Sequence, residues 1–295
     1  MISASSEPTD HALDKARAPS AATEVRLIEP VRGFSIPGPR MLIRNADLLY
    51  FLGRRDVAVR YKQTAIGLLW VVIQPAILAV VFSVFLNGVA KVPSGAGVPY
   101  PVFAVTGLTL WIAFTMILSR TSNSVVESIN LVSKVFFPRI LIPIAATLAP
   151  LVDFVLAFFL SVVLMFLFGI TPSPRIFLVF IPAAIMVGLA LGTGLWFAAL
   201  NVRYRDVAVA VPAIVQVGLF VTPIIYPANL VPDNLRNVYA LNPLVGTFES
   251  FRYALFPGAA TPGLTVVYSA IAAVVLLVTG AAYFQRAQAN FADYI

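Results

Sequence analysis

The residue types that carry enzyme chemistry are scarce in this sequence, and they do not gather into catalytic motifs. Histidine occurs once, at His11, and cysteine is absent. The sequence contains no GxxxxGK[ST] phosphate loop, no HExxH zinc motif and no GxSxG nucleophile motif. These absences argue against a nucleotide, metal or serine-nucleophile site on this chain. We therefore expect no catalytic residue, no metal and no cofactor on it.

Asp153 is the only acidic residue within the long apolar stretches of the sequence. A carboxylate at membrane depth is costly and often marks a transport path. Two interpretations of Asp153 stay open: a polar group that lines a pathway, or one half of a hydrogen bond between helices. A single acid gives little support to proton- or sodium-coupled transport, which usually needs several intramembrane polar groups.

The elements that position these few polar residues are apolar helices. Hydrophobic residues make up 60% of the 295 residues, and charged residues make up 11%. A soluble domain could not cover so much apolar surface, and about 20 apolar residues suffice to cross a bilayer. We expect an all-α polytopic membrane protein. Its six spans are predicted at about 66–87, 101–119, 140–168, 177–200, 207–226 and 264–284.

The Lys and Arg residues predict the orientation of these spans. If the N-terminus lies in the cytoplasm, 16 of the 20 basic residues fall in inside segments. The other four fall outside, at Lys91, Arg175, Arg236 and Arg252. By the positive-inside rule both termini are cytoplasmic. The net charge of +7 then reports topology, and we expect no nucleic-acid partner.

Four segments lie outside the predicted spans or at their edges, and the sequence predicts a structure for each. Residues 1–44 are rich in Ala, Ser, Pro and charge and predict a disordered tail before a permease domain at 45–295. Residues 45–62 predict a helix with two narrow apolar stripes. Residues 120–139 are long for a connector and predict a docking surface or a helix on the lipid surface. Residues 227–262 predict a pair of short helices that re-enter the membrane.

Four motifs carry a resemblance to a known family. They are RDVAVRYKQTAIGLLWVVIQP (55–75), NLVSKVFFPRILIP (130–143), NVRYRDVAVAVPAIVQVGLFVTPIIYP (201–227) and LNPLVGTFESFR (241–252). In this order, and with six spans, they resemble the permease subunits of bacterial ABC exporters for lipid-linked polysaccharides, of the O-antigen and teichoic-acid type. The resemblance runs from about residue 45 to the C-terminus.

The resemblance implies a homodimer in the bacterial inner membrane, bound to two copies of a separate ATPase subunit that holds ATP and Mg. The exported molecule would be an undecaprenyl-type lipid-linked glycan. Helix 45–62 would be an amphipathic cytoplasmic gate helix, and 228–258 a pair of external gate helices. The residues implied in docking the ATPase are Glu127, Lys134, Phe136, Phe137 and Arg139.

The resemblance also implies residues that meet the substrate. The predicted pathway residues are Tyr100, Phe103, Trp111, Tyr226 and Tyr253, with Asp153. At the cytoplasmic gate, Arg55, Arg60 and Lys62 would meet the lipid pyrophosphate beside Tyr61, since Arg and Lys pair with phosphate. The alternatives are ordinary packing or interface-belt aromatics, and basic residues that anchor to lipid headgroups.

The sequence leaves three other functions open. An ABC exporter of drugs or small lipids shares the six-span plan. An ion-coupled flippase is disfavoured by the single intramembrane acid, Asp153. An integral-membrane glycosyl- or acyltransferase is disfavoured by the lack of an acid or histidine constellation.

Overall fold

The computed structural model describes residues 38–62, 69–129, 131 and 137–291, and the statements below concern these residues. They belong to one compact unit, and every regular element in them is a helix. The predicted tail falls mostly outside them. Its last six residues form a short helix, α1 (Pro39–Arg44).

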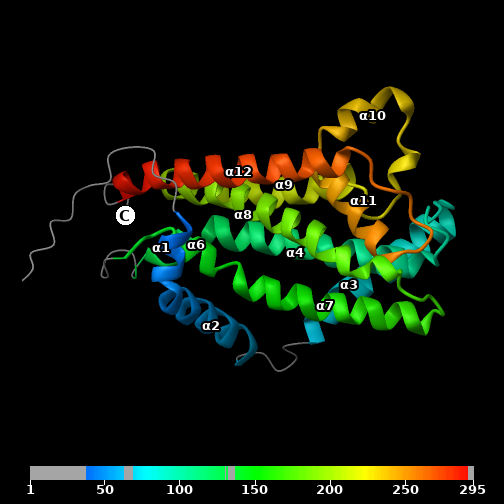
Figure 1. Ribbon diagram of the computed structural model, residues 1–295, viewed down its shortest axis with the longest axis horizontal. Coiled ribbons are helices and arrows are strands. Elements are labelled where there is room, and N and C mark those ends of the chain that lie inside the picture. The colour runs from blue at the N-terminus through cyan, green and yellow to red at the C-terminus, as the bar shows by residue number, and fades with distance from the viewer. Residues whose placement is uncertain (1–37, 63–68, 130, 132–136, 292–295) are drawn as a thin grey trace, which may run out of the picture. The chain divides into compact units, whose positions relative to one another are not determined.

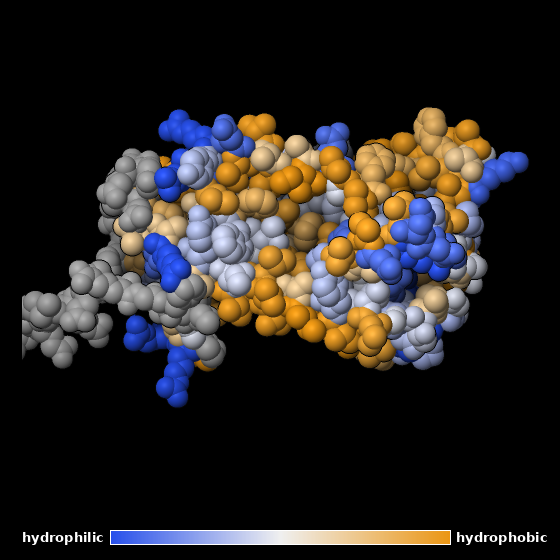
Figure 2. Space-filling view, turned by 90° about the horizontal axis from the view of Figure 1, so that it is seen from above, coloured by the Kyte–Doolittle hydropathy of each residue, from blue (hydrophilic) through white to orange (hydrophobic). Residues whose placement is uncertain are grey.

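Among the described residues, five helical segments are long and apolar enough to cross a membrane. They are Leu69–Val89, Tyr100–Glu127, Leu141–Leu167, Pro174–Arg203 and Thr265–Ala287. The protein is therefore an all-α polytopic membrane protein. Figure 2 shows a largely apolar surface along one face, with the hydrophilic side chains mostly near its two ends.

Helix α4 (Tyr100–Glu127) forms the centre of the bundle and is buried along most of its length. It packs against α3 (Leu69–Phe82), α7 (Leu148–Leu167) and α8 (Phe180–Arg203). It also extends eight residues beyond the predicted span, into the predicted loop. Asn201 of α8 holds this polar end, because its Nδ2 donates to the Asn123 Oδ1 at 2.9 Å. This hydrogen bond between α8 and α4 stabilises the last turns of α4, where the composition of the sequence predicts a loop.

The predicted 140–168 span is two helices, α6 (Leu141–Ala145) and α7. The break at residues 146–147 has a local cause. Pro150 has no N–H for the Ala146 carbonyl four residues earlier, and its ring crowds that carbonyl. The predicted single span is thus interrupted by a bend at a proline.

Helix α9 (Val207–Val221) covers only the first 15 residues of the predicted 207–226 span. It ends there because Pro223 disfavours helical geometry at the preceding residue, and Thr222 is extended with ψ 144°. Fifteen residues make about 22 Å of helix, against about 30 Å of hydrocarbon. Along α9 only Val211 is buried.

Helices α8 and α12 (Thr265–Ala287) lie side by side in close contact (Figure 1). Glycines permit the approach. A Cβ on Gly192 would lie 2.6 Å from the Leu276 carbonyl carbon, and a Cβ on Gly280 would collide with the Gly192 carbonyl oxygen. Small residues at such interfaces let the backbones of membrane helices come together.

Different helices lie at the two ends of the bundle (Figure 1). The α2 end contains α2 (Ala46–Lys62), α6 and the C-terminal end of α12. The α11 end contains α10 (Asp233–Ala240) and α11 (Pro243–Leu255). The predicted external segment thus does contain two helices. They differ in burial, because α11 is mostly buried whereas α10 has no buried residue.

Candidate functional site

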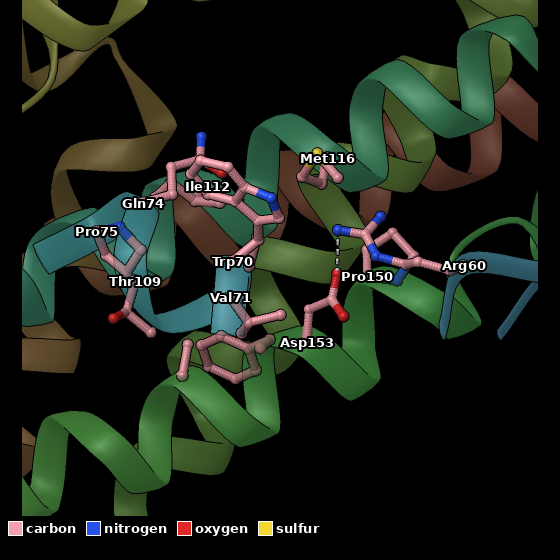
Figure 3. A pocket seen from close by; sticks show the side chains of 13 residues that line it. Arg60, Trp70, Val71, Gln74, Pro75, Thr109, Ile112, Met116, Pro150 and Asp153 are labelled. Atoms are coloured by element: carbon pink, nitrogen blue, oxygen red, sulfur yellow. Dashed lines mark ion pairs between the residues drawn. The ribbon is translucent and has the colours of Figure 1, made fainter. Parts of the chain in front are cut away.

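Asp153 of α7 joins α7 to the last turn of α2. The Arg60 Nη2 lies 2.6 Å from the Asp153 Oδ2, and the Tyr61 hydroxyl donates to the Asp153 Oδ1. Figure 3 shows the arginine and the carboxylate facing each other beside a pocket. The contact between Arg60 and Oδ2 is ionic, since this buried oxygen has no well-aligned hydrogen bond among the described residues. The interhelical hydrogen bond considered for Asp153 is present, and its role in a pathway stays a prediction.

Residues with different predicted roles are in contact at this junction. Arg60 and Tyr61 were predicted at the gate, and Asp153 in the pathway. The side chains of Arg60 and Asp153 are 24% and 12% exposed, so water screens the pair only partly. Burial, and then the hydrogen bond to Asp153, raise the pKa of Tyr61. Tyr61 therefore keeps its proton and remains a donor to the carboxylate.

The pocket beside this junction is small in the single chain. Its cavity volume is about 50 Å³, and its lining includes Trp70, Gln74 and Thr109 besides Arg60 and Asp153. Such a volume holds a few water molecules at most. A glycan cannot pass through it, so any pathway here requires another arrangement of the helices or a surface shared with a second chain.

The other predicted gate residues are exposed. Arg55 pairs with its neighbour Asp56 at 2.9 Å, with side-chain exposures of 47% and 30%. Lys62 is exposed at the last position of α2. An exposed pair of this kind contributes little to stability. Arg55 and Lys62 are thus accessible from outside the bundle, whereas Arg60 is held by Asp153.

Three of the five predicted docking residues lie within the described residues. Glu127 is exposed at the end of α4 and lines two neighbouring pockets, one with Arg55 and the other with Arg205. Phe137 is half-buried and packs on an apolar cluster to which α4, α6, α8 and α12 contribute. The Arg139 Nη1 donates to the Gln288 carbonyl at 2.7 Å. Lys134 and Phe136 lie outside the described residues.

At the α11 end, a buried arginine organises the aromatic residues. The Arg252 guanidinium lies 3.8 Å from the centre of the Phe103 ring, and its Nη2 donates to the Ile224 carbonyl at 2.8 Å. The Tyr100 hydroxyl donates to the next carbonyl, that of Ile225, at 2.6 Å. The short stretch of backbone after α9 is therefore held by one side chain from α11 and one from the start of α4.

Arg252 and its neighbour Glu249 were not predicted as site residues. The sequence predicts Arg252 only as an external basic residue. Arg252 is 6% exposed, and burial lowers the pKa of its guanidinium to about 9, so it stays charged at neutral pH. The available signal was a lone Glu and Arg three residues apart in an otherwise apolar helix, TFESFRYALF.

The predicted pathway aromatics divide into separate groups. The Tyr226 hydroxyl accepts from Tyr239 at 3.2 Å and donates to the Phe220 carbonyl at 2.8 Å. Burial, followed by this hydrogen bond, raises the pKa of Tyr239. Tyr226 directly follows the two residues whose carbonyls bind Arg252 and Tyr100, so it lies at the same end of the bundle.

Two further predicted aromatics lie elsewhere. Trp111 is buried and stacks on Phe114, with ring centres 5.5 Å apart. Tyr253 lies under the Arg175 guanidinium at 3.9 Å. The structure therefore brings Tyr100, Phe103 and Tyr226 into one region and leaves Trp111 and Tyr253 outside it. Their roles in a substrate pathway stay predictions.

Comparison with known proteins connects these features with a family. The family model described as ABC-2 type transporter matches residues 47–256. The chain is 27% identical over 252 residues to the O-antigen export system permease protein RfbA of Klebsiella pneumoniae, covering 84% of this chain and 95% of that protein. With RfbA of Myxococcus xanthus the identity is 26% over 262 residues, with coverages of 87% and 98%.

A second kind of relative is the polysialic acid transport protein KpsM of Escherichia coli. It is 23% identical over 236 residues, covering 78% of this chain and 90% of that protein. The family match extends from α2 to the end of α11 and so includes both the Asp153 junction and the Arg252 region. The resemblance carried by the four motifs is confirmed by these relatives. The chain belongs to the ABC-2 type transporter family.

Proposed function

We propose that this chain is the transmembrane subunit of an ATP-driven exporter that moves a lipid-linked polysaccharide outward across the bacterial inner membrane. The observation that carries the proposal is the nearly full-length similarity to O-antigen export permeases. The similarity to a polysialic acid transport protein supports a polysaccharide as the exported class. The undecaprenyl-type carrier follows from the family resemblance.

The chain acts as one half of a channel and is not itself the ATPase. ATP and Mg bind to two copies of a separate subunit, because this sequence has no phosphate loop. Two copies of the chain form the channel. The exposed side chains of Val209, Ile214, Val217 and Phe220 on α9 support a contact with lipid or with a second chain.

The topology has six crossings, with both termini in the cytoplasm. Helix α9 is too short to cross by itself, and the residues after Val221 complete this crossing. The distribution of Lys and Arg supports this orientation, in which the α2 end is cytoplasmic. Helices α10 and α11 then form the external pair, with α11 as the member that re-enters the membrane.

The α2 end receives the lipid pyrophosphate. Arg55 and Lys62 offer exposed positive charge there. Arg60 is held by Asp153, so a pyrophosphate that binds Arg60 competes with this carboxylate. Glu127 and the segment around Phe137 form the surface for the ATPase.

Reconstituted vesicles test the proposal. We expect vesicles that contain this chain and its ATPase to move a lipid-linked glycan on addition of ATP, and vesicles with an ATPase that cannot hydrolyse ATP to move none. Movement by this chain alone, driven by a proton gradient, would contradict the proposal. Depletion of the chain in its host should cause the lipid-linked glycan to accumulate on the cytoplasmic side.

A further inference from the structure

A pocket opens beside Arg252 at the α11 end, with a largely apolar lining. Its cavity volume is about 140 Å³. Three loop segments, 94–96, 227–229 and 259–261, form its wall, and Phe103, Glu249 and Arg252 line it from the helices. At about 30 Å³ per water in the liquid, this space corresponds to roughly five waters or one ring-sized molecule.

The two charged residues of the pocket keep unused bonding capacity. A guanidinium has five N–H groups, and among the described residues the only hydrogen bond of Arg252 is the one to the Ile224 carbonyl. Its Nε is buried without a partner. Buried donors without partners are rare and costly. Glu249 uses Oε2 to accept from the Thr265 hydroxyl at 2.9 Å, which leaves Oε1 as an acceptor.

Arg252 and Glu249 lie three residues apart in α11 and line one pocket, yet they form no ion pair in the described part of the chain. The charge pattern narrows the class of ligand. A free anion is repelled by Glu249, and a cation is repelled by Arg252. A neutral molecule that both donates and accepts hydrogen bonds satisfies both groups. Ala96, Pro227 and Ala259 supply the apolar wall that small-molecule pockets usually have.

We propose that this pocket binds one neutral sugar ring, with its hydroxyl groups donating to Glu249 and accepting from Arg252. The inference rests on the proposed function for the source of the sugar, which is the glycan as it leaves the channel. It adds a specific subsite in which two charged residues, beside the predicted pathway residue Phe103, recognise the sugar.

Ligand-detected saturation-transfer NMR tests the proposal with the full-length chain in lipid nanodiscs. The probes are methyl α-D-glucopyranoside and methyl α-D-mannopyranoside, with glucuronate and inorganic phosphate as charged comparisons. We expect saturation of at least one neutral glycoside. Saturation of the charged probes only, or of none, would overturn the proposal.

Two variants show whether the signal arises in this pocket. Glu249→Gln keeps an acceptor for Thr265 and removes the charge, and it should reduce saturation at least threefold. Ala260→Trp should reduce it similarly by filling the mouth, because Ala260 is an exposed lining residue. The matched control is Arg236→Gln, an exposed arginine of α10 paired with Asp233 at 2.8 Å, and it should leave saturation unchanged.

Unchanged saturation in both pocket variants would place the sugar elsewhere and refute the subsite. Failure here is distinguishable from failure of the proposed function. If vesicles with the ATPase export glycan but no neutral glycoside binds, only the subsite is wrong. If glycosides bind and the variants behave as expected but no ATP-driven export occurs, the exporter proposal is wrong and the pocket stands.

Discussion

Asp153 connects two parts of the molecule that are far apart in the chain. It contacts Tyr61, which lies 92 residues earlier. Its carboxylate receives a hydroxyl donor and a guanidinium from consecutive residues of α2. Breaking a buried ion pair from one side leaves a charge without compensation. The pair therefore matters more for the position of α2 than the exposed Arg55–Asp56 pair on the same helix.

The first prediction concerns this coupling. We expect Arg60→Gln and Asp153→Asn each to destabilise the protein by about 1–3 kcal/mol, less than for a fully buried pair because Arg60 is partly exposed. The double variant should lose less than the sum of the two losses. Thermal unfolding in nanodiscs, followed by tryptophan fluorescence, provides the measurement. Arg55→Gln is the control, with an expected effect within about 0.5 kcal/mol. Additive losses would show that Arg60 and Asp153 act independently.

At the scale of the elements, prolines and glycines decide where helices end and how closely they pack. Pro150 explains the break between α6 and α7, and Pro223 explains the end of α9. Gly192 and Gly280 allow the contact between α8 and α12, where an added Cβ would meet backbone. Backbone atoms cannot move aside as a flexible side chain can, so these positions tolerate no larger residue.

The second prediction follows from this contact. Gly280→Ala should separate α8 from α12 and destabilise the protein by about 1–3 kcal/mol, since overpacking forces backbone shifts. The stacked Trp196 and Tyr283, with ring centres 4.3 Å apart, lie across the same two helices. Their separation should appear as a change in tryptophan fluorescence. Gly263→Ala is the matched control, because an added Cβ there meets nothing within 4 Å. Equal stability of the two variants would contradict the close packing.

At the scale of the whole molecule, the two ends of the bundle carry different chemistry. The α2 end has exposed basic residues and the Asp153 junction, whereas the α11 end has a buried arginine, a half-buried glutamate and several aromatic side chains. This asymmetry agrees with the proposed uptake of a charged lipid carrier at the α2 end and release of a sugar polymer at the α11 end.

The third prediction concerns orientation. The chain has no cysteine, so single cysteines can be introduced without removing others. We expect Thr261→Cys to react with a membrane-impermeant maleimide in intact spheroplasts. Glu127→Cys should react only after the membrane is permeabilised. Both residues are exposed, so a difference reports their side of the membrane. The reverse pattern would place the α2 end outside.

The fourth prediction concerns the ATPase. We expect Glu127→Arg to reduce co-purification of the ATPase subunit at least tenfold and to leave membrane insertion intact, because the residue is exposed and contributes little to packing. Phe137→Asp should also abolish co-purification. Its half-buried position means that it needs a parallel measurement of stability. Asp233→Arg, an exposed residue of α10 at the other end, is the control. Normal co-purification with Glu127→Arg would remove this residue from the interface.

Several features were predictable from the sequence because they depend on local composition. Runs of apolar residues predicted the membrane class and the places of the five long spans. The helix predicted at 45–62 is observed as α2, one residue shorter at its start. Prediction from the sequence failed where a contact between residues far apart in the chain outweighs local composition. At the polar end of α4, for example, Asn201 donates to Asn123 and the helix continues.

By itself, the sequence determined the all-α membrane architecture and, through its motifs, the family. Hydrophobicity and short motifs are properties of neighbouring residues, so they can be read without the fold. Only the tertiary structure decided that Arg60 and Tyr61 meet Asp153, and that Arg252 lies buried on Phe103. These contacts join residues far apart in the chain, and their geometry exists only once the helices have packed.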